Sequence, residues 1–389
     1  MFPARGRVRS ARHVTLTTIQ NDDFAQRLGS WMTAAGPESD VVVSCRARLA
    51  RNLADEAFIS RLDEARADAL ADRLRDVLDQ GIADGKALGD DSGHWVDIRE
   101  SGPVTRLLLR ERHLVSRDLA PIEEQRTVQR GRSVFFTKSE TVSAMVNEED
   151  HLRLQGYAGG LDLERAWQRA RDLDVLLEKS VDYAVSEQLG YLTACPTNVG
   201  TGMRASVMLH LPALGIVRSE LEKVFSSAQR TGLAVRGMYG EGSRAAGDLY
   251  QISNQVTLGR SEQDLIGDLL ALVPKIVAFE RKIRQALLEE REDPLQERVA
   301  RSFGMLSNAR MMPSDVALMH LSNLRLGVAL GLFDRLSLEE LNGLSIQIQR
   351  GHVQVRAGGS GDDRLLDSQE RDRLRATFLR DRLGNPPEA

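Results

Sequence analysis

Residues 191–210 read YLTACPTNVGTGMRASVMLH, and this stretch decides the fold. Its first half, residues 195–202, is dense in turn-forming residues and predicts a loop with exposed backbone N–H groups. Its second half, residues 204–211, predicts a strand whose two-residue period places four side chains on one face. They are Arg204, Ser206, Met208 and His210. A thiol and an arginine at the two ends of this loop suit an anionic ligand beside a reactive group. For Cys195 alone, a small buried side chain is the simpler interpretation.

The composition is that of an ordinary folded protein. At 389 residues the chain is long enough for two domains, taking about 150 residues for each. A net charge of −4 argues against a dedicated nucleic-acid binder, whose domain would be basic. Two cysteines, Cys45 and Cys195, provide no disulfide framework and predict a reducing, cytoplasmic location. No apolar run is long enough to span a membrane, and no Cys/His cluster has metal-ligand spacing. Residues 1–12 are basic, but no apolar segment follows, so they predict no secretory signal.

A second arginine-bearing segment occurs at residues 40–48, DVVVSCRAR. Its valine run predicts a buried strand, and the two-residue period then puts Arg46 and Arg48 on one face with Ala47 opposite. One exposed arginine is usually a solvated charge. Two arginines aimed together beyond a buried strand favour an anion site, and the planar guanidinium suits phosphate.

Strands and helices are predicted along the whole chain. Residues 95–100 and 104–111 predict one hairpin, residues 132–137 and 140–147 a second, and residues 233–239 and 249–257 two more strands. If the second hairpin stays extended, positions 149, 151 and 153 share a face. Helices are predicted over residues 22–35, 56–88, 161–189 and 212–231. Strands joined by hairpins with helices on one face define an α+β layer architecture. Beyond residue 262 only helices are predicted, over residues 265–292, 295–306, 314–333 (with Ser314 as N-cap), 337–349 and 368–383.

Five segments occur in this order along the chain: SCRARLARN at 44–52, NEEDHLR at 147–153, CPTNVGTGMRASVMLHL at 195–211, RGMYGEGS at 236–243 and QISNQ at 251–255. In this order they resemble the motifs of the phosphagen (guanidino) kinases, and among these the bacterial protein-arginine kinases. The resemblance implies the fold shared by guanidino kinases and glutamine synthetase, a curved antiparallel sheet flanked by helices and followed by an all-α C-terminal domain. The implied divisions are an N-terminal extension over residues 1–39, a catalytic domain over 40–275 and a helical domain over 276–389.

The activity that the resemblance implies is transfer of the γ-phosphoryl group of Mg²⁺-bound ATP to arginine side chains of proteins. The phosphoarginine formed would mark proteins for degradation or regulate a stress response. The chain contains no G-x-x-x-x-G-K-[ST] motif and no protein-kinase H-R-D or D-F-G, so a family that binds phosphates through arginines fits. The implied partners are protein substrates, a zinc-finger activator protein, an AAA+ unfoldase-protease and a second copy of the chain. Neither nucleic acid nor a membrane is implied.

The resemblance also implies a nucleotide site. Arg46, Arg48, Arg153, Arg204 and Arg236 would clamp the phosphates, and His113 would contact the adenine. For any one of these arginines a surface salt bridge is an equally good interpretation, but five together favour the site. The whole implied set is Ser44, Cys45, Arg46, Ala47, Arg48, His113, Arg153, Arg204, Ala205, Ser206, Val207, Met208, Arg236, Gly237, Met238, Tyr239 and Gly240.

Three further residues match the family's catalytic positions: Glu149 its base, Glu241 its second carboxylate and Cys195 its thiolate. The acceptor guanidinium cannot attack while its lone pair is delocalised and protonated. Two carboxylates that pair with it would orient it and take its proton. Cationic surroundings would favour the thiolate of Cys195. Beside Glu149, two acidic residues would either hold water around Mg²⁺ or be solvated charges. They are Glu148 and Asp150.

The C-terminal RDRLRA at residues 371–376 resembles an element that binds phosphoarginine, through Arg371, Asp372, Arg375 and Ala376. On composition alone it is a solvated, charged helix face. Two departures from the family occur, Cys45 in place of serine and Arg244 in place of glutamate, and the second leaves substrate preference open.

Three alternatives to a protein-arginine kinase remain open. The first is a phosphoarginine-binding adaptor with weak catalysis, which the matched catalytic residues disfavour. The second is a small-guanidine phosphagen kinase, disfavoured because those enzymes carry a longer helical domain before the first arginine segment. The third is a glutamine-synthetase-like ligase, which would need ammonia or an amine.

Overall fold

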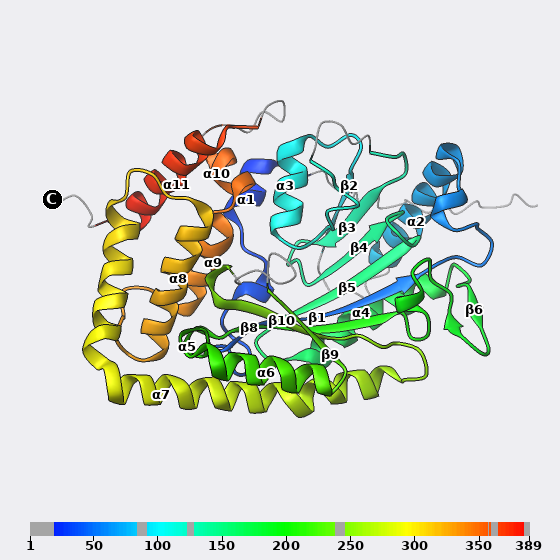
Figure 1. The fold of residues 1–389 in the computed structure, drawn as a ribbon. Helices are drawn as coiled ribbons and strands as arrows, with labels where there is room; N and C mark the ends of the chain where they lie inside the picture. The colour runs from blue at the N-terminus through cyan, green and yellow to red at the C-terminus, as the bar shows by residue number, and fades with distance from the viewer. Residues whose placement is uncertain are drawn as a thin grey trace, which may run out of the picture.

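A computed structural model describes residues 19–83, 92–122, 128–237, 246–356, 358 and 365–384. Its centre is an eight-stranded antiparallel sheet in the order β2-β3-β4-β5-β1-β8-β10-β9 (Figure 1). A separate two-stranded hairpin, β6-β7, projects at one end. The strands are β1 (Val42–Arg51), β2 (Gly93–Asp97), β3 (Ser133–Thr137), β4 (Val142–Val146), β5 (Leu152–Gly159), β6 (Val185–Ser186), β7 (Gly190–Tyr191), β8 (Met203–His210), β9 (Leu233–Gly237) and β10 (Leu249–Asn254).

One face of the sheet forms the main hydrophobic core. On β1, Cys45, Ala47 and Leu49 point to this face and are at most 2% exposed. The helices α4 (Leu163–Glu178), α6 (Arg218–Arg230) and α7 (Glu262–Asn308) cover it, and α2 (Glu64–Ala83) adds Leu70, Leu74 and Leu78 to the same core. Alternation of apolar and polar residues along β1 and β8 fixes which face is buried, because successive strand side chains point to opposite sides.

Among the described residues, helices cover the other face of the sheet at its two ends. Helices α1 (Asn21–Gln26) and α3 (Pro103–Glu111) pack on β2, β3 and β4 in a second core that includes Phe24, Leu108 and Phe136. At the opposite end, α8 (Ser314–Ala329) and α9 (Leu338–Gln347) lie against β8 and β10. Polar side chains occupy the stretch of this face between the two coverings.

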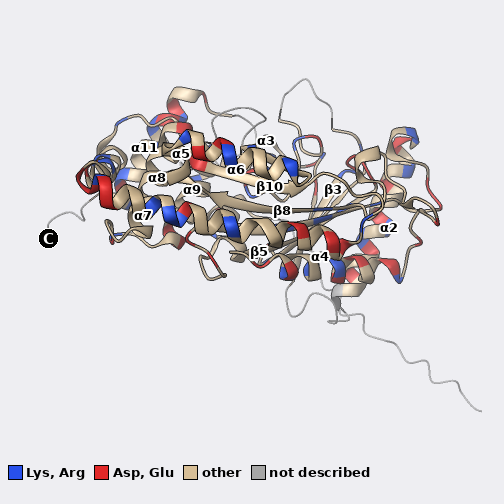
Figure 2. Ribbon diagram, turned by 60° about the horizontal axis from the view of Figure 1, so that its bottom comes forward, with Lys and Arg blue, Asp and Glu red and all other residues tan. Residues whose placement is uncertain are grey.

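The C-terminal part is helical, as predicted. Helices α7, α8, α9 and α11 (Ser368–Leu383) share a third core, and the short α10 (Arg350–Arg356) packs against α3. Figures 1 and 2 show α7 running along the sheet at one end and beside α8 and α11 at the other. Two predicted helices, 265–292 and 295–306, are therefore one element with a kink. Arg291 has non-helical dihedrals there, three residues before Pro294, whose ring disrupts the preceding turn. The helix passes through the predicted domain boundary at 275/276.

The predicted hairpin of residues 95–100 and 104–111 is wrong. Residues 103–111 form α3, with Pro103 at its first position and Val104, Leu107 and Leu108 buried at helical spacing. Proline is favoured at that position because its missing N–H would have no helical partner. The sequence Ser-Gly-Pro therefore begins a helix, and β2 pairs with β3 instead. The second predicted hairpin, β3-β4, is confirmed.

Several predicted helices are too long. The helix over 22–35 ends at Gln26, and a separate 3-10 turn, η1 (Ser30–Met32), follows. Helix α4 ends at Glu178 because the β6-β7 hairpin takes up residues 185–191. Helix α2 (Glu64–Ala83) begins eight positions after the predicted start, behind a 3-10 turn at Ile59–Arg61. The segment 212–231 divides at Val217 into α5 (Pro212–Ile216) and α6.

The predicted cap at Ser314 is also wrong, since Pro313 is the N-cap of α8 and no side chain caps that helix. By contrast, Ser337 begins α9 with a capping box.

Arg51 holds three parts of the catalytic region together. Arg51 follows Leu49 in β1 at the two-residue spacing of the core-facing side chains. Its side chain therefore lies on the core face, opposite to the face of Arg46 and Arg48. Its Nη2 lies 2.8 Å from Asp174 Oδ2 on α4, and its Nη1 donates to the Thr201 carbonyl at 3.0 Å. The guanidinium also stacks 3.4 Å from the ring centroid of Tyr191.

We expect Asp174→Ala to lower the free energy of unfolding by about 3–5 kcal/mol, because it leaves the buried Arg51 charge without its partner. Urea denaturation of the full chain measures this loss. The control is Asp55→Ala, which breaks an exposed ion pair with Arg73 and should cost about 0–1 kcal/mol. Equal losses in the two variants would contradict the role given to Arg51.

Candidate active site

The register of the sheet gathers arginines on the face opposite the main core. Within β1, the two-residue period aligns Arg46 with Arg48. β1 pairs with β8 so that Arg48 lies opposite Arg204, and with β5 so that Ala50 lies opposite Arg153. Directly opposed residues point to the same face of a sheet. Three neighbouring strands therefore present four guanidinium groups to one surface.

Arg236 on the edge strand β9 extends this surface. It lies opposite Gln251 of β10, which lies opposite Met208 of β8. The strand alternation predicted for residues 204–210 is confirmed, since Met208 shares the face of Arg204. We call this surface the arginine face. Its members are Arg46, Arg48, Arg153, Arg204 and Arg236.

The guanidinium groups of the arginine face repel one another. Burial lowers the pKa of Arg48 well below its usual 12.5, and repulsion from Arg46, Arg153 and Arg204 lowers it further. Glu148 acts in the opposite direction. Within the described ranges, neither Arg46 nor Arg48 forms an ion pair with a carboxylate. A ligand of several negative charges would stabilise these two guanidinium groups beside each other.

Carboxylates approach the arginine face from the turn between β4 and β5. Glu148 is buried and its Oε2 lies 2.5 Å from Arg153 Nη1. Glu149 Oε2 lies 3.1 Å from Arg153 Nη2, and the side chain is 43% exposed. Partial burial raises the pKa of Glu149; Arg153 lowers it, whereas the nearby charges of Asp150 and Glu148 raise it. Glu149 is thus a carboxylate that solvent or a second chain can reach, with a pKa shifted toward that of a general base.

His151 does not share a face with Glu149 and Arg153, contrary to the expectation for an extended segment. The chain turns through residues 147–151, and β5 begins only at Leu152. His151 is fully buried, and its Nδ1 accepts a hydrogen bond from the Leu53 N–H at 3.1 Å. It therefore fixes the turn rather than facing the site.

Asn52 and Asp150 connect this turn to the cysteine loop. Asp150 is 1% exposed, and its Oδ1 accepts from Asn52 Nδ2 at 2.6 Å and from the Ala194 N–H at 2.7 Å. Asn52 Oδ1 accepts from the His151 N–H at 2.9 Å. The expectation that Asp150 is a solvated charge is wrong for this buried side chain, and a role in holding water around Mg²⁺ stays a prediction. Sequence reasoning missed Asn52, because no local pattern signals contacts among positions about 50 and 100 residues apart.

The two cysteines differ in their surroundings. Cys195 lies at the start of the 3-10 turn η3 (Pro196–Asn198), is partly exposed, and its Sγ is 3.0 Å from Thr197 Oγ1. Cys45 is in the main core, and burial raises the pKa of its thiol to about 12. Cys45 therefore cannot act as a thiolate near neutral pH. Three other members of the implied nucleotide set also have side chains in this core, so only their backbones can meet a ligand. They are Ala47, Ala205 and Val207.

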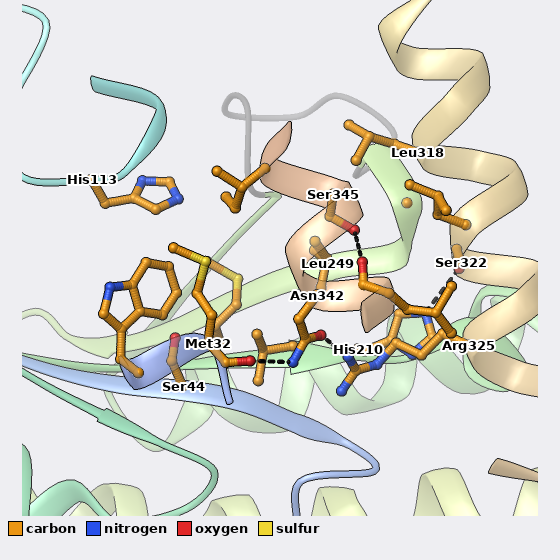
Figure 3. A pocket seen from close by; sticks show the side chains of 17 residues that line it. Met32, Ser44, His113, His210, Leu249, Leu318, Ser322, Arg325, Asn342 and Ser345 are labelled. Atoms are coloured by element: carbon orange, nitrogen blue, oxygen red, sulfur yellow. Dashed lines mark hydrogen bonds between the residues drawn. The ribbon is translucent and has the colours of Figure 1, made fainter. Parts of the chain in front are cut away.

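A largely apolar pocket continues the arginine face at its other end (Figure 3). Ser44, His113 and Met208 line it together with Trp31 of η1 and residues of α8 and α9. Burial, and then Arg46, lowers the pKa of His113 to about 4, so its ring is neutral at pH 7. His113 has a left-handed φ of 61°, and its carbonyl accepts from Tyr157 Oη at 2.6 Å. The pocket suits a flat, uncharged group attached to an anion on the arginine face.

Part of the predicted site lies outside the described residues. This part is Met238, Tyr239, Gly240 and Glu241, with the family departure at Arg244. Gly237 ends β9. In the described ranges no helix could cross a membrane, and no group of three or more His, Cys, Asp or Glu side chains is arranged to hold a metal ion.

The C-terminal element on α11 is not a plain solvated face. Arg375 is 2% exposed, and its guanidinium donates to the Ile348 carbonyl at 2.6 Å and to Asp372 Oδ1 at 2.6 Å. Ala376 is fully buried, and Arg371 donates to the Leu366 carbonyl. The Asp372–Arg375 pair therefore connects α11 to the end of α9.

The geometry defines an enzyme site for a polyanion with a flat head group, placed beside an accessible carboxylate and a thiol. Residues 80–283 match the family described as ATP:guanido phosphotransferase, C-terminal catalytic domain. Residues 292–389 match the one described as protein-arginine kinase McsB C-terminal domain.

Similar proteins of known name agree with these matches. The chain is 42% identical to the protein-arginine kinase of Halothermothrix orenii over 362 residues, which is 93% of this chain and 98% of that one. It is 42% identical to the protein-arginine kinase of Bacillus subtilis over 358 residues, or 92% of this chain and 93% of that one.

Solved structures of phosphagen kinases are also similar. Lombricine kinase matches with a TM-score of 0.53 and 25% identity over 68% of this chain and 71% of that one. The duplicated taurocyamine kinase of Schistosoma mansoni has the same TM-score and identity over 67% of this chain, which spans 38% of that longer protein. The chain belongs to the ATP:guanido phosphotransferase family, in its protein-arginine kinase branch.

The carboxylates around Glu149 predict how activity depends on pH. A general base works only when deprotonated, so the rate should fall as pH drops through the raised pKa of Glu149. Glu148→Gln removes a repelling charge and leaves Glu149 as the charged partner of Arg153 among the described residues. Both effects lower the pKa of Glu149, so the acidic limb of the profile of kcat/KM against pH should move to lower pH. The control is Glu164→Gln, because Glu164 lies on α4, which covers the opposite face of the sheet. This variant should leave the acidic limb at the wild-type pH. A limb that stays in place in Glu148→Gln would contradict this electrostatic account.

Proposed function

We propose that the chain transfers the γ-phosphoryl group of ATP to arginine side chains of proteins, with the triphosphate bound on the arginine face. The observation that carries the proposal is Arg48, a guanidinium crowded by Arg46, Arg153 and Arg204 and without an ion-pair partner among the described residues. Phosphoryl transfer requires cations against the spread charge of the phosphate oxygens, and arginine forks bind those oxygens in bidentate fashion. The five arginines would supply this charge without a P-loop.

Mg²⁺ is the second cofactor that we propose. It binds through one or two carboxylates together with substrate phosphates and does not need a closed protein cage. The site fits this mode, since Glu148 lies at the arginine face while no larger acidic group occurs among the described residues. When bound, the ion would neutralise charge that develops on the phosphates.

Glu149 would act as the base toward the acceptor guanidinium. A guanidinium nitrogen attacks the γ-phosphorus, the bond from that phosphorus to the β,γ-bridging oxygen breaks, and the nitrogen's proton passes to the Glu149 carboxylate. Its 43% exposed side chain can be reached by an arginine carried on another chain. Cys195 would stabilise the guanidinium as a thiolate, and Glu241 would be the second carboxylate that orients it.

Protein arginine is the acceptor that we propose, in preference to a free guanidine. The support is the name protein-arginine kinase, carried by relatives that align over more than nine-tenths of this chain. The solved neighbours are kinases of taurocyamine and lombricine and align over about two-thirds of it. A cytoplasmic location, a homodimer, a zinc-finger activator, an AAA+ unfoldase-protease, a role in protein degradation or stress, and the division of domains at 40–275 stay predictions from the resemblance.

We expect Glu149→Gln to reduce phosphorylation of an arginine-containing protein by about 10²–10⁴-fold, the usual contribution of a general base. Binding of ATP should change little, because the amide keeps the shape of the side chain and all five members of the arginine face are retained. Phosphate incorporation from labelled ATP measures the first quantity and calorimetry the second. The same acceptor with its arginines changed to lysine is the control, and free arginine tests the small-guanidine alternative. Wild-type turnover by Glu149→Gln would remove this residue from the mechanism.

We also propose that Asp372 and Arg375 on α11 bind phosphoarginine. The Asp372 carboxylate would accept hydrogen bonds from the guanidinium group of the ligand, and Arg375 would donate to its phosphoryl oxygens. Arg375 also anchors backbone carbonyls, so its removal would disturb folding, and Asp372→Asn is the better variant. In a Glu149→Gln background, Asp372→Asn should lower the affinity for free phosphoarginine about tenfold in calorimetry. Glu370→Gln, on the same helix, is the control. Affinity equal to the parent's would mean that the element is an ordinary structural helix.

A further inference from the structure

Large apolar side chains are exposed at the end of the molecule where the hairpin β6-β7 projects (Figure 1). Val185 and Leu189 of this hairpin are 57% and 44% exposed, and Leu258, in the segment after β10, is 49% exposed. These three side chains line one groove together with Glu178 and Glu262. We call it the hairpin groove. Single exposed apolar residues are ordinary, but a group of them with a polar rim is typical of an interaction surface.

The hairpin groove is continuous with the loop that carries Cys195. Gly200, five residues after Cys195, also lines the groove. It has a φ of 112°, and a Cβ at this position would lie 2.4 Å from the Thr257 carbonyl oxygen, so glycine allows the two segments to approach closely. Thr257 Oγ1 donates to the Val199 carbonyl at 2.6 Å. The Cys195 loop and the segment that bears Leu258 are therefore fixed against each other.

The carboxylates of the hairpin groove favour a basic ligand. Neither Glu178 nor Glu262 forms an ion pair with another residue in the described part of the chain. Arg260 also lines the groove, but its Nη2 lies 2.8 Å from Asp268 Oδ2 and is paired there. A protein segment that carries arginine is complementary to this acidic rim, whereas a second copy of this chain brings a net charge of −4.

The separation of the groove from Cys195 limits which part of an acceptor can reach it. Five residues span at most roughly 18 Å, so Gly200 lies no farther than this from Cys195. An extended acceptor covers the same distance in about five residues. When the target guanidinium lies beside Cys195, a side chain within about five positions of that arginine can therefore enter the groove.

We propose that the hairpin groove binds an extended segment of the acceptor protein, through an aliphatic or aromatic side chain within about five residues of the target arginine. This side chain packs on Val185, Leu189 and Leu258, where its burial removes apolar surface from water on both partners. The two carboxylates attract basic residues beside it. The inference rests on the proposed function and deepens it, since it names the sequence context that the kinase selects.

The test compares two acceptor peptides in the steady-state kinetics of phosphoryl transfer from ATP. Each peptide contains a single arginine, flanked on both sides within reach of the groove by leucine in one peptide and by serine in the other. The wild-type chain should have a KM about tenfold lower for the leucine peptide, which corresponds to about 1.4 kcal/mol. Its kcat should be similar for the two peptides, because contacts far from the reacting atoms contribute equally before and in the transition state.

The first variant combines Val185→Thr with Leu189→Ser, which removes apolar surface and keeps a β-branched residue in β6. Its KM for the leucine peptide should rise to within about threefold of its KM for the serine peptide, with kcat unchanged. The control is Met305→Ser, because Met305 is 45% exposed but lies at the far end of α7 from Glu262. Thermal unfolding of each variant confirms that a changed KM comes from a folded protein.

A second variant tests the acidic rim. A lysine added beside the leucines should lower the KM of the wild-type chain about twofold to threefold at low salt, because exposed charges attract weakly and are screened by ions. Glu178→Gln combined with Glu262→Gln should remove this gain. A gain that persists in the double variant would contradict the role given to the two carboxylates.

The remaining outcomes separate this inference from the proposed function. If the wild-type chain phosphorylates both peptides with the same KM, or if the Val185 and Leu189 variant keeps the wild-type difference, the inference is wrong and the proposed function stands. If that variant keeps the difference but sediments as a smaller species than the wild-type chain, the groove joins two copies of the chain instead. If the wild-type chain phosphorylates neither peptide nor an arginine-containing protein, the proposed function itself fails.

Discussion

The register of β1 against β5 and β8 is the constraint on which the rest of the structure depends. It sets Arg46, Arg48 and Arg204 on one face and the small core residues of the same strands on the other. A slip of one residue would exchange the two faces and bury the guanidinium groups in the core. The buried face, packed under α4 and α7, thus stabilises the register that brings the positive charges of the opposite face together.

The same residue type has two uses in β1. Arg51, on the core face, is fully paired with Asp174 and fixes the start of the strand β8 through Thr201. Arg48, three residues earlier on the other face, lies among other arginines. The paired arginine contributes to the structure, and the crowded ones need a ligand. Asn52, which follows Arg51, then holds the Glu149 turn and the Cys195 loop together through Asp150, so one strand positions both sides of the reaction.

Local patterns in the sequence were enough for the parts of the fold that obey a simple period. The alternation in β8, the β3-β4 hairpin and the helix over 368–383 are confirmed. The prediction failed where turn-forming residues had two interpretations. Residues 101–103 were interpreted as a hairpin turn, but α3 begins at Pro103. For the site, the period of β1 and β8 predicted which arginines share a face. It could not predict that Asn52 and Asp150 join the Glu149 turn to the Cys195 loop, because those contacts connect positions about 50 and 100 residues apart.

The central claim is that this surface phosphorylates arginine within proteins. Mass spectrometry of a protein acceptor incubated with the chain and ATP, kept under non-acidic conditions because acid hydrolyses the P–N bond, tests it most directly. The account predicts phosphoryl groups on arginine side chains of the acceptor and none when ATP is omitted. Phosphoryl groups found only on hydroxyl side chains, or none on protein while free arginine is phosphorylated, would contradict it.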